Sequence, residues 1–249
     1  MKPGQASEFL RRRTATGLGL FVLAVCAFVA PQPAFAIPTL QLDIGGGIYV
    51  GGEEETVFAT ASTFTLYALL MPDGNDLSDT YFISAALRPA TGPPGTDAGS
   101  FVFDGTTVNV TADMDYGVPP FETYISFDPG DLAKHGIFET YFEEFSFQFE
   151  DANTCAPYDV QEYPGTGPQT GNGMYWFAFL VDTSGLSAGY SIHFDLYNAK
   201  IKGGDTDRNL FAPFSHDANS RVPEPASLLL LGLGLAGLGV VAWRRKRSA

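Results

Sequence analysis

The chain has 249 residues, 28 of them acidic and 14 basic, with a formal net charge of −14. The acidic excess lies between residues 37 and 221, where 26 acidic residues stand against six basic ones, a difference of −20. Such a surface repels the phosphates of nucleic acids and of anionic lipids, so nucleic acid is excluded as a partner. The aromatic content of 14% and a stretch of about 185 residues indicate one folded domain with its own core.

The amino-terminal segment has the features of a secretory signal peptide. A basic start precedes an apolar run over residues 18–30, and Ala34 and Ala36 supply the two small residues that signal peptidase requires. The apolar run is shorter than a membrane-spanning helix needs, which argues against a retained anchor. Residues 1–36 are therefore predicted to be a signal peptide that signal peptidase removes before Ile37.

Two cysteines bear on the compartment. Cys26 lies in a sequence that weakly resembles a lipobox. The residue before a lipidated cysteine is normally Gly, Ala or Ser, but here it is Val25, which argues against lipidation. Removal of the signal peptide leaves Cys155 alone, so an intramolecular disulfide is excluded. Because Cys155 lies in a polar stretch, we expect its thiol to be exposed.

The central region shows apolar residues with a period of two, which is typical of β-strands, and many Gly/Pro-rich turns between them. The expected strands are 63–69, 81–87, 100–103, 106–111, 145–149, 174–181 and 191–201. We find no convincing amphipathic helix. The pattern predicts an all-β fold, an antiparallel β-sandwich of jelly-roll type over residues 37–202, followed by a linker over residues 203–221.

Two details of these strands are specific predictions. Asp104-Gly105 separates two apolar runs and predicts a β-hairpin with a two-residue turn. The segment 174–181 is continuously apolar and predicts a central strand that is buried on both faces.

The carboxyl-terminal segment combines three features in order. Pro223, Glu224 and Pro225 form a tripeptide that must stay extended, because neither proline fits a helix interior. Residues 226–243 carry no charge and reach roughly 27 Å as a helix, close to the thickness of a bilayer's hydrocarbon core. A basic cluster follows at once and predicts a cytoplasmic end; it consists of Arg244, Arg245, Lys246 and Arg247.

This arrangement over residues 222–249 resembles the PEP-CTERM sorting tail of Gram-negative bacteria. The resemblance implies an exosortase as the processing enzyme and a membrane intermediate with its ectodomain outside the cytoplasm. It also implies a final position in the cell envelope, on the surface or in the extracellular matrix, in association with extracellular polysaccharide.

The central region is similar to the choice-of-anchor N family, whose members share a secreted domain. Five segments carry this similarity: 40–47, 64–70, 81–87, 110–117 and 135–142. The resemblance implies a surface module and no catalytic residue.

Acidic loops make structural calcium a possible cofactor, and no other cofactor is expected. The segment 205–209 has the alternating oxygen ligands that begin an EF-hand loop, but Leu210 and His216 replace the glycine and the bidentate glutamate of that motif. A solvated linker is the competing interpretation. The candidate ligands in the two loops are Asp73, Asn75, Asp76, Asp79, Asp205, Asp207 and Asn209.

Catalytic motifs are missing from the sequence. The two carboxylates of a glycosidase must face the same side of the substrate site. Glu143 and Glu144 are adjacent on an expected strand, so their side chains point to opposite faces. The histidines at positions 135, 193 and 216 have no metal-ligand spacing, so a zinc site would need convergence in the tertiary structure. We therefore expect no enzymatic activity.

Aromatic residues leave a carbohydrate-binding role open, because sugar rings stack on exposed aromatic faces. Tyr116 and Tyr163 lie in predicted loops and are the expected glycan contacts, whereas Trp176 is expected to pack in the core. The predicted function is a non-enzymatic, structural or adhesive surface protein. The alternatives are a secreted glycan-active hydrolase and a carbohydrate-binding module.

Overall fold

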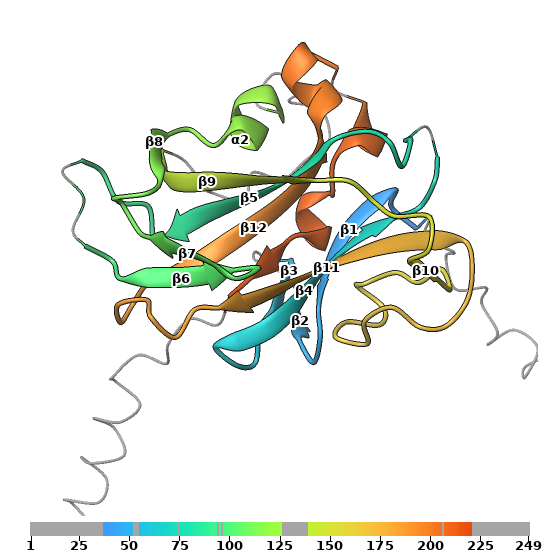
Figure 1. Cartoon of the computed structure of the whole chain (residues 1–249), viewed down its shortest axis with the longest axis horizontal. Helices are drawn as coiled ribbons and strands as arrows, with labels where there is room; N and C mark the ends of the chain where they lie inside the picture. Colours follow the sequence, from blue (N-terminus) through green and yellow to red (C-terminus); the bar gives the residue numbers. More distant parts are fainter. Residues whose placement is uncertain are drawn as a thin grey trace, which may run out of the picture. The chain divides into compact units, whose positions relative to one another are not determined.

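The computed structural model describes residues 37–51, 55–73, 75–93, 95, 97–125, 139–205 and 207–220. Within this part the fold consists of two β-sheets (Figure 1). Sheet A has the order β1 (Leu40–Ile44), β4 (Thr63–Leu70), β11 (Met174–Asp182), β6 (Ser100–Phe103) and β7 (Thr106–Asn109), with β10 (Thr154–Cys155) also paired to β11.

Sheet B has seven strands and contains the end of the described chain. Its order is β2 (Ile48–Val50), β3 (Thr56–Phe58), β13 (Ala218–Asn219), β12 (Ser191–Asn198), β5 (Tyr81–Arg88), β9 (Thr140–Phe147) and β8 (Asp115–Gly117). All described pairings are antiparallel except that of β13 with β3, which is parallel. The all-β prediction with two sheets is confirmed.

The hydrophobic core lies between the two sheets. Leu66 and Phe179 of sheet A and Ile83 and Phe194 of sheet B are all buried in one cluster. Aromatic rings cross from one sheet to the other, and the rings of Phe103 and Phe194 lie 6.3 Å apart. The period of two explains this packing, since it points one side of each strand into the same apolar layer.

The predicted hairpin is confirmed. β6 and β7 pair antiparallel across Asp104 and Gly105, whose φ angles are +47° and +79°. Two successive positive φ angles define the turn type that matches the twist of a hairpin, and Asp-Gly adopts them at little cost. Gly46, with φ of +71°, lies in the turn between β1 and β2, where Gly45 does not have a positive φ.

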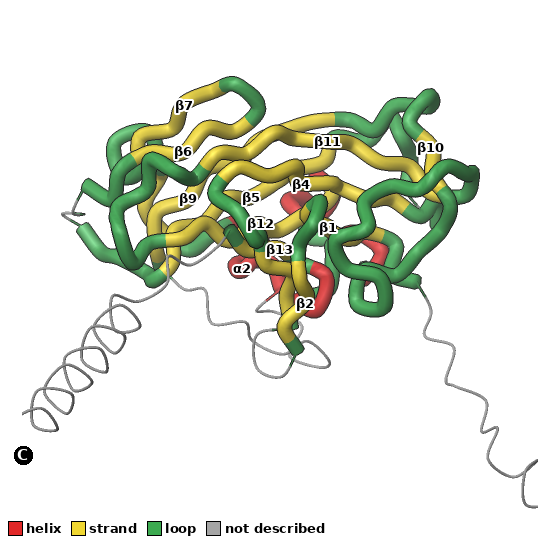
Figure 2. The backbone as a smooth tube through the Cα atoms, turned by 90° about the horizontal axis from the view of Figure 1, so that it is seen from below, coloured by secondary structure: helices red, strands yellow, loops and turns green. Residues whose placement is uncertain are grey.

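Short helices cover the outer face of sheet B, where the sequence had indicated no helix. They are α2 (Pro120–Ile125) and the 3-10 helices η1 (Ala199–Gly203), η2 (Arg208–Leu210) and η3 (Phe214–His216). Figure 2 shows these helical turns beside the layer that contains β12 and β13. Phe121 of α2, Ile201 of η1 and Phe214 of η3 pack with Tyr197 and Phe211 in a second, smaller core.

The structure corrects the linker prediction for residues 203–221. Most of its described residues are folded: Phe211, Phe214 and His216 are buried, and β13 lies between β3 and β12 in the sheet. Ser220 is also buried, and its amide donates to the carbonyl oxygen of Ile192 over 2.8 Å. Phe211 and Phe214 show no periodic pattern in the sequence, but both pack in the second core. The folded domain therefore extends to Ser220.

Two burial predictions are also wrong. Cys155 is fully buried, because pairing with Met174 of β11 carries it into the main core. β11 is central in sheet A, but its outer face is open and Leu180 is 58% exposed. Among the strands buried on both faces is β12, and the shorter β1 is another.

Candidate metal centre

β12 places two polar side chains on the outer face of sheet B. Ile192, Phe194 and Leu196 point into the main core, so the alternate residues His193 and Asp195 point to the opposite side. In a half-exposed strand these two residues would be solvated. Here both are 1% exposed, because the outer face is covered.

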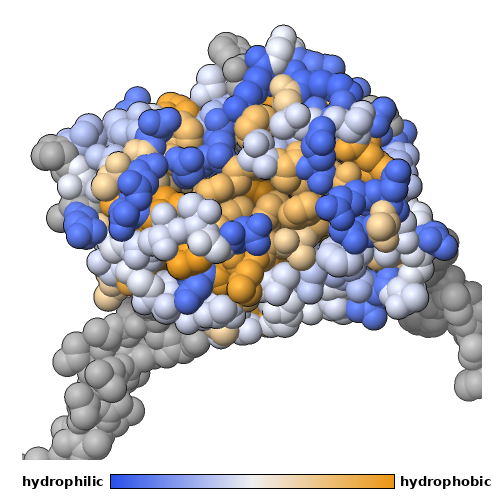
Figure 3. Space-filling view, in the orientation of Figure 1, coloured by the Kyte–Doolittle hydropathy of each residue, from blue (hydrophilic) through white to orange (hydrophobic). Residues whose placement is uncertain are grey.

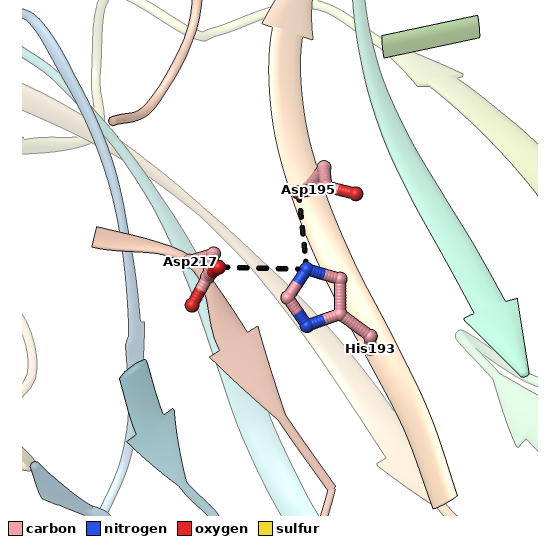
Figure 4. A group of neighbouring side chains, drawn as sticks. All are labelled: His193, Asp195 and Asp217. Carbon is pink, nitrogen blue, oxygen red and sulfur yellow. Dashed lines mark hydrogen bonds and ion pairs between the residues drawn. The ribbon is translucent and has the colours of Figure 1, made fainter. Parts of the chain in front are cut away.

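A third ionisable residue reaches the same point from the adjacent segment. Asp217 immediately precedes β13, which pairs with β12 so that Asn219 lies opposite His193. The Nε2 atom of His193 lies 3.1 Å from Oδ1 of Asp195 and 3.5 Å from Oδ2 of Asp217 (Figure 4). One ligand atom from each of the three residues lies within 4.8 Å of the other two.

Neighbouring groups hold two of these side chains in place. The Nδ1 atom of His193 lies 2.9 Å from Oδ1 of Asn219, and the hydroxyl of Thr56 donates to Oδ1 of Asp217. An amide oxygen only accepts hydrogen bonds, so Nδ1 carries the proton that it donates to Asn219. The other ring nitrogen, Nε2, therefore faces the two carboxylates.

Two carboxylates around one imidazole nitrogen favour a positive charge at that point. Removing a charged group from water is costly, so a cation or a proton between the two buried carboxylates would stabilise them. A proton on Nε2 would make an imidazolium that donates to both aspartates. A metal ion bound to Nε2 would supply the same positive charge with a defined coordination geometry.

The calcium candidates lie elsewhere in the structure. The two predicted loops do come together: Nδ2 of Asn75 donates to the carbonyl oxygen of Asn209 over 2.6 Å. Lys200 lies 2.7 Å from Oδ2 of Asp79, which also accepts from Nδ2 of Asn198 over 2.9 Å. A lysine ammonium therefore already neutralises the Asp79 carboxylate.

The other predicted calcium ligands mostly shape their own loops. Asp76 accepts from the amide and the hydroxyl of Ser78, which lowers the pKa of its carboxyl. Asp205 accepts from the amide of Asp207, and Asp207 caps η2 by accepting from the amide of Asn209. The side chain of Asp73 is exposed. Calcium binding at these loops stays a prediction.

Both tyrosines proposed as glycan contacts are accessible. Tyr116 on β8 is 39% exposed and Tyr163 is 57% exposed. The hydroxyl of Tyr116 lies 3.4 Å from Oε2 of Glu139, and its ring centre lies 5.3 Å from that of Tyr141. Trp176 is half-buried and packs edge-to-face with Tyr67, so one part of its ring belongs to the surface of sheet A.

The paired glutamates are directed to different surroundings. Glu144 on β9 binds Lys202 over 2.8 Å and accepts from the hydroxyl of Tyr197. The pKa of Glu143 is raised by partial burial and by the charges of Asp115, Glu144 and Asp113. Adjacent residues of a strand point to opposite sides, as the sequence indicated.

A second buried histidine pairs with another carboxylate. His216 Nε2 lies 3.2 Å from Oδ1 of Asp159, and its Nδ1 lies 2.8 Å from the hydroxyl of Ser215. Burial raises the pKa of Asp159, but the hydrogen bond and charge of His216, with two backbone amides, outweigh it and lower that pKa overall. This pair fastens the loop after β10 to η3.

Asp43 anchors the same loop to β1. Its carboxylate accepts from the amides of Ile44, Gly165 and Gly167 and from the hydroxyl of Tyr158, over 2.8–3.0 Å. Burial raises the pKa of Asp43, and these four donors partly offset the rise. All of its oxygens serve the loop, so the geometry indicates a structural role.

Sequence reasoning missed the convergence of His193, Asp195 and Asp217. The spacing of His193 and Asp195 was a usable signal, since two residues apart on a strand means one face. Asp217 was assigned to a linker, and no local pattern shows that it lies beside β12. Only the pairing of β13 brings it there.

Several predicted features lie outside the described residues. They are the signal segment 1–36 with Ala34 and Ala36, the tripeptide Pro223, Glu224 and Pro225, the span 226–243, and the basic residues Arg244, Arg245, Lys246 and Arg247. In the part of the chain that the structure does describe, the helices are too short to cross a membrane.

Comparison with known families identifies the carboxyl-terminal segment. Residues 221–247 match the family described as the PEP-CTERM protein-sorting motif. The chain thus carries the motif of exported proteins that an exosortase processes, which directs them to the envelope or surface of a Gram-negative bacterium. No curated protein and no solved structure matches the chain. The similarity to the choice-of-anchor N family stays a prediction.

Proposed function

We propose that this chain is a non-enzymatic surface or matrix protein whose two-sheet domain is delivered by its sorting tail and contributes structure or adhesion. The observation that carries the proposal is the junction between domain and tail. The sorting motif begins at Arg221, directly after Ser220, which is buried and bonded to β12. The tail is thus continuous with a strand inside sheet B.

This junction favours a load-bearing connection. β13 lies between β3 and β12, so a force on the tail acts on a strand with hydrogen-bonded neighbours on both sides. A flexible linker would instead separate the domain from its anchor. The route includes signal peptidase at Ile37, a membrane intermediate through residues 226–243, and processing by exosortase.

Contact with extracellular polysaccharide is the proposed role of the exposed surface. Figure 3 shows an apolar area on the face that carries β6, β9 and β11 in Figure 1. The half-buried rings of Phe145 on β9 and Phe177 on β11 belong to these strands. Aromatic faces with an accessible side suit stacking by sugar rings, as does exposed Tyr163.

The sorting step is tested with Glu224→Ala in the full chain, expressed in a host that contains an exosortase. We expect unprocessed protein to accumulate in the membrane fraction, because the change removes the charge between the two prolines without touching the apolar span. Intact mass and fractionation measure this. The control is Glu162→Ala, an exposed glutamate of the domain, which should mature normally. Maturation of Glu224→Ala to the wild-type mass would contradict the proposed sorting step.

The role of the domain is tested separately with the mature protein on purified extracellular polysaccharide. We expect binding without release of reducing sugar, and weaker binding by Tyr163→Ala than by the neighbouring control Thr166→Ala. Turnover that is lost when one carboxylate is replaced would favour the glycan-active hydrolase. Absence of binding to any polysaccharide would leave adhesion to proteins or a purely structural role.

A further inference from the structure

We propose that His193, Asp195 and Asp217 bind one divalent first-row metal ion of the zinc class, and that this ion fastens β13 to β12. The ligands are Nε2 of His193, Oδ1 of Asp195 and Oδ2 of Asp217. Zinc in proteins takes histidine nitrogen and carboxylate oxygen at about 2.0–2.2 Å. The site is independent of the acidic loops, which offer oxygen ligands only.

The separations between the ligand atoms fit an ion placed among them. The distances from Nε2 to the two carboxylate oxygens are 3.1 Å and 3.5 Å. For an ion about 2.1 Å from each atom, these separations correspond to angles of roughly 95° and 113° at the metal. Both angles at the metal are close to those found in octahedral or tetrahedral coordination. One carboxylate oxygen of each aspartate lies within 4.8 Å of the other aspartate's ligand atom and of the imidazole's.

The orientation of the imidazole also suits a metal. Asn219 accepts the proton of Nδ1, so the lone pair of Nε2 is directed at the carboxylates in the neutral ring. An ion at this position would be coordinated by that lone pair and by one oxygen of each carboxylate. Metal-bound histidines characteristically donate their other nitrogen to an oxygen acceptor, as His193 does here.

Supporting groups surround the ligands as they do in metal sites. Thr56 donates to Oδ1 of Asp217, whereas the proposed ligand is the other oxygen of that carboxylate, Oδ2. Ser84 lies opposite Asp195 on β5, so their side chains share one face of the sheet. Within the described part of the chain the buried hydroxyl of Ser84 makes no hydrogen bond, and a metal-bound water would supply one.

The choice of ion follows from the ligand types. A histidine nitrogen favours zinc and its first-row neighbours over calcium and magnesium, which prefer oxygen alone. Three protein ligands leave at least one coordination position for water. Because two ligands lie on β12 and the third immediately precedes β13, the ion would cross-link the strand that leads into the sorting motif.

The test begins with the wild-type full-length protein in detergent, stripped with a chelator and dialysed against zinc or cobalt. We expect one equivalent of tightly bound metal per chain and a higher melting temperature, since a ligand that binds the folded state stabilises it. Cobalt should give a visible d–d band, and X-ray absorption of the zinc form should show one nitrogen among oxygen neighbours. This measurement needs no variant and is independent of exosortase processing.

Variants then locate the metal. His193→Gln and Asp195→Asn should lose stoichiometric binding, and Thr56→Val should weaken it by roughly 10–100-fold, as expected for a group that orients a ligand. The matched control is His216→Gln, which removes the other described buried histidine and leaves the three ligands intact. Circular dichroism establishes that each variant is folded.

Two results would overturn the proposal. In one, the stripped wild-type protein takes up no zinc or cobalt and melts at the same temperature with and without them, which would leave the three side chains as a hydrogen-bonded cluster without metal. In the other, His193→Gln and Asp195→Asn retain the wild-type metal content, which would place the ion elsewhere. Neither result bears on whether Glu224 is needed for sorting.

Discussion

β11 and β12 are long central strands of opposite sheets, and their burial is the reverse of what their sequences indicate. β11 is apolar almost throughout, yet its outer face is open and Leu180 is 58% exposed. β12 alternates polar and apolar residues, yet all of its residues are buried. The difference lies in what covers the outer face of each sheet.

The covering layer of sheet B explains the contrast. The rings of Phe121 and Tyr197 stack 5.8 Å apart, and Phe211 and Phe214 pack around Phe121. His193 and Asp195 lie on the same outer face as Tyr197 and are buried as well. Polar residues on a covered face need partners, so a strand of this kind acquires a hydrogen-bonded cluster that an open face does not require.

The largest effect is expected from Asp195→Ala on β12. This change removes the carboxylate that lies 3.1 Å from the buried imidazole of His193. Removing one partner of a buried ionic group typically lowers the free energy of unfolding by about 3–5 kcal/mol. Urea denaturation in the presence of a chelator measures it without any contribution from bound metal. A loss below about 1 kcal/mol would mean that the outer face of β12 is hydrated in solution, like that of β11.

A smaller effect of pH is expected at Cys155, which lies beside the start of β11. Burial raises the pKa of the Cys155 thiol to about 11, whereas an unfolded cysteine titrates near 8.5. The folded protein therefore keeps a proton that the unfolded chain releases. This contribution to stability is complete below about pH 8.5 and falls as pH rises toward 11, by about 2 kcal/mol at pH 10.

Other groups also titrate in this range, so the measurement compares the wild type with Cys155→Ala. Stability curves from pH 7 to 10 should converge as the pH rises, because only the wild type loses the cysteine contribution. At pH 8 the thiol should react with a disulfide reagent only after denaturant is added. Rapid labelling of the native protein would support the exposed position expected from the sequence instead.

A change in the covering layer should have a moderate effect. Phe121→Leu keeps an apolar side chain over Tyr197 but removes the ring stacking, and should lower the free energy of unfolding by about 1 kcal/mol. Hydrogen exchange should become faster at the amides of β12 and stay the same at those of β11. Equal acceleration in both strands would show that α2 does not protect sheet B in particular.

The smallest effect is expected on the open face of β11. Leu180→Thr should change the free energy of unfolding by no more than about 0.5 kcal/mol, because the residue is mostly exposed and threonine suits a strand. Chemical denaturation measures this directly. A loss of about 2 kcal/mol or more would indicate that another surface covers Leu180 in solution, as in a self-associated form.

Local sequence patterns were sufficient for much of this protein. The period of two placed the long strands, and Asp104-Gly105 placed the hairpin, because backbone preferences act over a few neighbouring residues. The sorting motif at residues 221–247 could also be recognised from the sequence, because its parts follow one another along the chain. These features need no knowledge of distant segments.

Burial and convergence were decided only by the tertiary structure. Nothing near His193 in the chain shows that its side chain is buried, nor that Asp217 lies 3.5 Å from its ring. The same holds for Asn75 and Asn209, which join two loops that appear independent in sequence. Hydrophobic periodicity reports which side chains share a face of a strand, but whether that face meets water depends on segments that are remote in sequence and adjacent in space.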